Sequence, residues 1–244
     1  MPSERSHLIG SVAGLALAAG AVLAAVILSS TWRRIAESQV VTVTGSAHRN
    51  VRSDLAVWHA SFSADADSIL EAQKRLTSDR QKVEAFLQAN AVKDFAILPV
   101  QIREITAHSD PGADSVPVTI GYRLTRNVEV RSADVESLPR LSSDSTDLIQ
   151  QGVVFASQGI DFIYTKAGDA KVEMMAEATK DARTRAEQIA NQGGRTIKAL
   201  RSAKMGVVQI NPLYSSATSW EGNNDTTSIE KTITATVTAT FGLQ

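Results

Sequence analysis

The chain has 244 residues, of which 43% are hydrophobic and 21% charged, so it can build a packed core and is not a disordered polymer. Its formal net charge is −1, which excludes the strongly basic surface typical of nucleic-acid-binding proteins, and we expect no nucleic-acid partner. It contains no cysteine, which excludes disulfides, thiolate metal sites and a cysteine nucleophile.

The most apolar stretch of the chain lies near the N-terminus. After a leader at residues 1–7, residues 8–28 form a run of 21 residues without charge, proline, asparagine or glutamine. As a helix, this run would measure about 30 Å, the thickness of the hydrocarbon core of a bilayer. It is longer than the apolar region of a cleaved signal peptide, about 7 to 15 residues. We therefore expect an uncleaved transmembrane anchor, with a signal peptide as the alternative.

Basic residues beside the anchor bear on its orientation. Arg5 precedes the run, whereas Arg33 and Arg34 follow it in a stalk predicted at residues 29–38. The positive-inside rule therefore points the rest of the chain toward the cytoplasm, by a margin of one basic residue.

Residues 39–244 carry the periodicities of a folded α+β domain. Strict alternation of apolar and polar residues predicts strands, and apolar residues at every third or fourth position predict helices. In chain order we expect strands at 39–52 and 54–66, a helix at 68–90 and strands at 95–108 and 116–131. Residues 132–151 are weakly helical, and we expect two short helices or one frayed helix there. A strand at 152–165, a helix at 169–192 and strands at 195–211 and 226–241 follow.

Particular residues mark the ends and faces of these elements. Ser68 followed by Glu71 is a capping box, which predicts the start of the first long helix. Pro99 indicates an edge strand, and the face that carries Trp58 is expected to be the core side of its strand. The second long helix has a predicted buried stripe of mostly small residues: Met175, Ala178, Ala182, Ala186 and Ile189.

The last strand is the most regular. One face carries a row of threonines, and the other face is apolar except for Lys231. We expect Lys231 at the strand end, with its amine in water. The threonines are Thr232, Thr234, Thr236, Thr238 and Thr240.

The order of elements repeats along the chain. The strand at 54–66, its helix and the next two strands match the strand at 152–165, its helix and the last two strands. We therefore expect duplicated strand-helix-strand-strand units, an antiparallel sheet packed by two long helices, and one N-terminal transmembrane helix. The periodicity leaves open whether the two halves share one continuous sheet.

No established catalytic or metal-binding motif is present. The four histidines lack metal-ligand spacing, and the chain has no nucleophile motif and no P-loop, so we expect no catalytic residue, metal or cofactor. The alternative site would need His48 and His59 on adjacent strands, with Asp65 nearby. Asp65 and Asp67 flank a helix start, where we interpret both as helix-capping carboxylates.

A polar loop at residues 213–225 contains two aromatic residues, Tyr214 and Trp220. One interpretation is local packing over the neighbouring hairpin. The other is a contact with a second subunit or a partner, because aromatic residues are enriched in interfaces.

Four stretches resemble the SIMPL-domain family of bacterial envelope proteins. They are VTVTGSAHRNVRSDLAVWHASFSA at 41–64, EMMAEATKDARTRAEQIANQGG at 173–194, IKALRSAKMGVVQ at 197–209 and SIEKTITATVTATF at 228–241. The resemblance is spread over the fold from Val40 onward rather than concentrated in a catalytic motif. The N-terminal run is similar to that of the membrane-anchored branch of the family.

This resemblance implies an α+β domain on the periplasmic side of the inner membrane. It also implies ring-like or channel-like homo-oligomers and a connection with envelope or oxidative stress, and it implies no catalytic residues. For orientation, we give the resemblance more weight than the single additional basic residue after the anchor.

Three functions follow as hypotheses. The first is a non-enzymatic, membrane-anchored periplasmic module that self-assembles and supports envelope integrity or oxidative-stress tolerance, with Tyr214 and Trp220 as candidate contacts. The second is a module that binds a small ligand or lipid in a cavity between sheet and helices. The third is an envelope enzyme that uses His48, His59 and nearby carboxylates.

Overall fold

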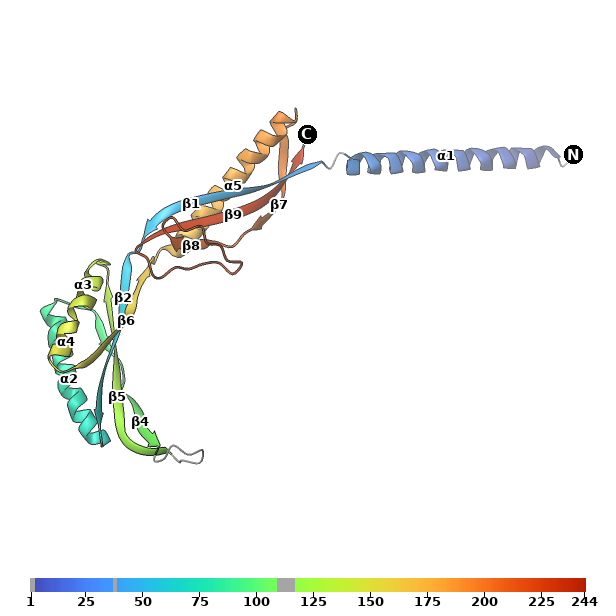
Figure 1. Ribbon diagram of the computed structural model, residues 1–244. Helices are drawn as coiled ribbons and strands as arrows, with labels where there is room; N and C mark the ends of the chain where they lie inside the picture. Colours follow the sequence, from blue (N-terminus) through green and yellow to red (C-terminus); the bar gives the residue numbers. More distant parts are fainter. Residues whose placement is uncertain (1–2, 37–38, 109–116) are drawn as a thin grey trace. The chain divides into compact units, whose positions relative to one another are not determined.

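A computed structural model describes residues 3–36, 39–108 and 117–244 (Figure 1). The side chains of residues 3–13, 15–16, 33–36 and 108 are not among those described. The chain divides into two compact units. The first unit comprises residues 1–47, 175–206 and 236–244, and the second comprises residues 48–174 and 207–235.

The N-terminal helix α1 spans Ser3–Ala36 and contains the whole segment predicted as an anchor. It also continues through most of the predicted stalk at residues 29–38. Several side chains of the predicted anchor, at 8–13 and 15–16, lie outside the described set. Within the part of the chain that is described, no helix combines the length and the hydropathy that a membrane crossing requires.

The second unit contains an antiparallel sheet in the order β3-β5-β2-β6, with β4 also paired to β5. Its strands are β2 (Leu55–Ala66), β3 (Phe95–Ile97), β4 (Gln101–His108), β5 (Pro117–Ser132) and β6 (Val154–Ile163). The predicted strand at 95–108 is divided between Ile97 and Gln101, around Pro99, because proline cannot donate a ladder hydrogen bond. Both resulting strands pair with β5 at the sheet edge, as predicted. The turn predicted at 109–114 lies outside the described residues.

Three helices cover one face of this sheet: α2 (Ile69–Ala89), α3 (Ser137–Asp144) and α4 (Thr146–Gln150) (Figure 1). The Oγ of Ser68 accepts a hydrogen bond from the amide of Glu71 and caps α2, as predicted. Trp58 is fully buried in the core between helices and sheet, which confirms the predicted core side of β2. The weak helical pattern at 132–151 corresponds to the two short helices.

A second antiparallel sheet has the order β1-β9-β7, and β8 also pairs with β9. Its strands are β1 (Val40–Arg52), β7 (Ile197–Met205), β8 (Gln209–Pro212) and β9 (Glu230–Leu243). The threonines of β9 lie on its solvent-facing side, and hydroxyl pairs at 3.0 Å join Thr42 to Thr240 and Thr44 to Thr238.

The helix of the first unit, α5 (Ala167–Gln192), begins in the second unit and packs a stripe of alanines on β1 and β9. The buried residues recur every four positions: Ala178, Ala182, Ala186 and Ala190. Ala178, Ala182 and Ala186 were predicted, but both ends of the predicted stripe are wrong: Met174 is buried in place of Met175, and Ile189 is 55% exposed. Because the buried positions recur every four residues, Ala190 packs against the sheet and Ile189 does not.

The α+β class and the antiparallel pairing are confirmed, and the described strands form two sheets, which answers the question that the periodicity left open. The predicted order of strands and helices is present in both halves. The strand pairing does not repeat between the halves. In the first half β2 pairs with β5, but β6, its counterpart in the second half, pairs with β2 rather than with β7 or β9, and β1 lies beside β9. Each long helix therefore contacts strands of a different sheet.

Candidate functional site

The histidines considered for an enzyme are not on paired strands. His48 is exposed on β1, which pairs with β9, whereas His59 lies on β2, which pairs with β5 and β6. The Nε2 of His59 is 3.4 Å from the Oδ2 of Asp161. Among the described residues, no group of three or more histidine, aspartate or glutamate side chains could hold a metal ion.

Asp65 pairs across strands instead of capping α2. Its two carboxylate oxygens accept hydrogen bonds from Arg123, at 2.8 Å from Nε and 2.6 Å from Nη2. These bonds lower the pKa of Asp65 below its ordinary value, against the opposing effect of burial. The capping role predicted for Asp65 is therefore wrong, and the side-chain cap of α2 comes from Ser68.

The strongest candidate for a functional surface is the connection between β8 and β9, residues 213–229, which we call the aromatic loop. Tyr214 is 94% exposed and Trp220 is 84% exposed. The interpretation that both pack locally over the hairpin is wrong. Two exposed aromatic side chains in one loop leave apolar surface in water that a binding partner could cover, and aromatic residues are enriched in interfaces.

Buried amide side chains at the start of the loop hold its backbone in one conformation. Gln209 donates to the carbonyl of Ser219 at 2.7 Å, and its Oε1 accepts from the amide of Asn223 at 2.8 Å. Asn211 donates to the carbonyl of Ala217 at 2.7 Å. Trp220 is therefore flanked by backbone that is fixed on both sides.

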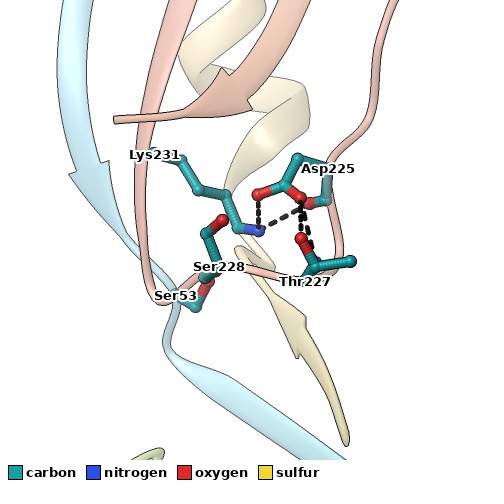
Figure 2. A network of polar contacts seen from close by, with 5 residues as sticks. All are labelled: Ser53, Asp225, Thr227, Ser228 and Lys231. Carbon is teal, nitrogen blue, oxygen red and sulfur yellow. Dashed lines mark hydrogen bonds and ion pairs between the residues drawn. The ribbon is translucent and has the colours of Figure 1, made fainter. Parts of the chain in front are cut away.

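A buried ion pair closes the other end of the loop (Figure 2). The amine of Lys231 lies 3.0 Å from the Oδ2 of Asp225 and 2.5 Å from the carbonyl oxygen of the same residue. The side chain of Lys231 is 1% exposed and that of Asp225 is 8% exposed. Lys231 stands at the start of β9 as predicted, but the expectation that its amine reaches water is wrong.

Further hydrogen bonds surround this pair (Figure 2). Thr227 donates to the Oδ1 of Asp225 through its backbone amide at 3.0 Å and through its hydroxyl at 2.7 Å. Ser53, between β1 and β2, donates its amide to the carbonyl of Ile229 at 2.9 Å and its hydroxyl to the carbonyl of Ser228 at 3.3 Å. The loop is thus tied to the start of β2 as well as to β9.

Protonation of Asp225 is expected to loosen this network. Burial raises the pKa of Asp225, but hydrogen bonds from Thr227, Lys231 and Ser228 outweigh it and lower the pKa to about 2 from 3.8. The stabilisation, on the order of 2 kcal/mol, is therefore present above about pH 4 and is lost as the pH falls toward 2. We expect the urea midpoint of the second unit, followed by fluorescence of the buried Trp58, to fall over this range. A Lys231→Met, Asp225→Leu double variant should lose part of that dependence.

A cavity of about 710 Å³ lies elsewhere in the second unit. It is bordered by the segment after α2, the end of β5 and helix α3, and it carries both basic and acidic side chains, among them Lys93, Arg140 and Asp134. This cavity is one space that a small ligand, as in the ligand-binding hypothesis, could occupy.

Sequence reasoning identified Tyr214 and Trp220 but missed the residues that position them. Asp225 carried no motif, and Gln209 and Asn211 were assigned only to a strand. One signal was present, since a lysine on the apolar face of a strand requires a nearby anion if it is buried. Asp225, six residues before Lys231, was the acidic residue to test.

Comparison with known protein families gives one result that covers most of the chain. The SIMPL family, described as a protein of unknown function (DUF541), matches residues 41–241. A search of curated proteins gave no match. The matched segment includes all of β2 to β8, the aromatic loop and most of β1 and β9. The chain therefore belongs to the SIMPL family.

Proposed function

We propose that this chain is a non-enzymatic, membrane-anchored envelope module that self-assembles through the aromatic loop. Residues 8–28 would hold it in the inner membrane, with the folded domain in the periplasm, where it would support envelope integrity or oxidative-stress tolerance. The observation that carries the proposal is the exposure of Tyr214 and Trp220 on a loop whose backbone is fixed by buried hydrogen bonds.

A fixed loop with exposed aromatic tips suits protein binding for two physical reasons. Tyrosine and tryptophan bury a large area with few rotatable bonds, so they lose little conformational entropy on binding. A loop that is already ordered also avoids the cost of ordering during association. A second copy of the chain is the proposed partner.

The absence of cysteine makes a site-directed cross-linking test direct. In the full-length chain in membranes, Ser216→Cys places one thiol on the exposed part of the aromatic loop. We expect a bis-maleimide to give a cross-linked dimer, and expect Tyr214→Ala with Trp220→Ala to reduce it by about tenfold, the usual effect of removing interface anchors. Val172→Cys, at a 64% exposed position on α5, is the control and should cross-link little.

The outcomes separate the hypotheses. Equal cross-linking with and without the two aromatics would reject the loop as the contact. Monomer alone would reject self-assembly through this loop and favour the second candidate, a small-ligand module that uses the 710 Å³ cavity beside α3. A membrane-impermeant bis-maleimide added to intact cells tests orientation, because it reaches Ser216→Cys only in a periplasmic loop.

A further inference from the structure

Two arginines face each other on the sheet of the second unit. Arg103 on β4 lies directly opposite Arg123 on β5 in the antiparallel register. Side chains at such positions have their Cβ atoms about 5 Å apart, and like charges placed there destabilise the pair of strands. On the other side of Arg123, Asp65 of β2 occupies the same row.

Only one of these two guanidinium groups has a carboxylate partner among the described residues. Asp65 occupies the Nε and Nη2 of Arg123. None of the described residues forms an ion pair or a side-chain hydrogen bond with Arg103. Its neighbour Glu104 points to the opposite face of β4, because successive side chains alternate, and it accepts a hydrogen bond from Thr119.

The two arginines border a hollow of about 330 Å³ on the face of the sheet opposite α2. Arg123, Thr125 and Asn127 alternate along β5 with the buried Leu124 and Val128, which places them on this outer face. The polar lining has two positive charges, three amides, one hydroxyl and no carboxylate: Gln101, Arg103, Arg123, Thr125, Asn127 and Gln158.

We propose that this hollow binds an oxyanion, a carboxylate or phosphate group carried by a small polar molecule. Guanidinium groups bind planar and tetrahedral oxyanions through paired N–H donors, and Arg103 has all of its donors available. The amides and the hydroxyl would bind the neutral polar part of the same molecule. An anion between the arginines also removes their mutual repulsion. This site is separate from the proposed self-assembly through the aromatic loop.

The test uses the full-length chain in a maltoside detergent, with inorganic phosphate and glucuronate as probes. Phosphate binding is followed by the ³¹P line width and glucuronate binding by saturation-transfer NMR. We expect saturable binding that weakens at least tenfold in Arg103→Gln, whose own thermal midpoint should stay unchanged or rise. Arg80→Gln, which removes the same charge from an exposed residue on α2, should bind like the parent chain.

Each outcome bears on the proposal. Saturable binding of either probe, lost in Arg103→Gln and kept in Arg80→Gln, supports the site, and the probe that binds identifies the group as carboxylate or phosphate. Binding that falls equally in both variants would be unspecific attraction and would overturn the proposal. No saturable binding of either probe, or full binding by Arg103→Gln, would also overturn it.

Discussion

Asp225→Asn is expected to lower the free energy of unfolding of the second unit by about 3 to 5 kcal/mol, the usual cost of leaving a buried charge without its partner. The amine of Lys231 would lose its carboxylate and keep only neutral oxygens of residue 225 as partners, and its side chain is almost fully enclosed. Urea unfolding followed by fluorescence measures the loss, because Trp58 is the buried tryptophan of the second unit.

The expected loss of free energy of unfolding arises because the ion pair is buried, and two variants test this. Glu84→Gln removes one partner of the exposed Arg80–Glu84 pair on α2 and should cost about 0.5 kcal/mol or less. Combining Asp225→Asn with Lys231→Met removes the unpaired amine, so the double variant should be more stable than Asp225→Asn alone. If Asp225→Asn and Glu84→Gln cost the same, the pair does not hold the loop.

The same variant connects stability with the proposed interface. If the pair at Lys231 closes the aromatic loop, Asp225→Asn should also weaken the cross-link at Ser216→Cys while leaving Tyr214 and Trp220 in place. The aromatic residues supply the contact surface, and the buried polar residues preserve its shape. Such preorganisation is how fixed loops gain affinity without adding contacts.

Local pattern was sufficient to predict most elements of this fold. Alternation identified β2 and its Trp58 face, and the capping residue identified the first turn of α2. These features depend on neighbours within a few positions, which is what periodicity reports. The division of the predicted strand at Pro99 follows equally from local chemistry.

Features that depend on distant partners could not be predicted in this way. Nothing in the alternation of β6 specifies β2 as its neighbour, because a period-two pattern fixes which face is buried but not which strand pairs with it. For the same reason the apparent repeat suggested equivalent pairing in both halves. The phase of α5 was misjudged at Ile189, because hydrophobicity favoured isoleucine where close packing required Ala190.

The candidate site also combines features that local sequence predicts with features that depend on distant partners. Tyr214 and Trp220 were evident as aromatic residues in a polar loop, but their exposure depends on hydrogen bonds made by Gln209 and Asn211. The partner of Arg123 was likewise hidden, since Asp65 is 58 residues away and meets it only through strand register.

Gly45→Ala is expected to destabilise the first unit by about 3 kcal/mol or more, at the upper end of what overpacking usually costs. A Cβ atom at Gly45 would lie 2.2 Å from the carbonyl oxygen of Ala178 and 2.3 Å from the amide nitrogen of Ala182. Both atoms belong to the backbone of α5, so no side chain can rotate to relieve the contact. The strand or the helix must move.

Movement at Gly45 would also disturb the next residue. The amide of Ser46 donates to the Oδ2 of Asp181 at 2.8 Å, and the same oxygen accepts from Arg185. Hydrogen exchange measured by mass spectrometry should therefore show faster exchange in β1 and the following part of α5, by about two powers of ten. Peptides from β2 and α2, in the second unit, are the internal control.

Gly168→Ala provides the matched substitution in the same helix. No atom lies within 4 Å of a Cβ at that position, so this variant should be neutral or slightly more stable, since alanine favours helix. Equal exchange in Gly45→Ala and Gly168→Ala would contradict the close approach of β1 to α5. Faster exchange in Gly45→Ala alone would establish that glycine here, and small residues at 178 and 182, set how closely the sheet and helix of the first unit pack.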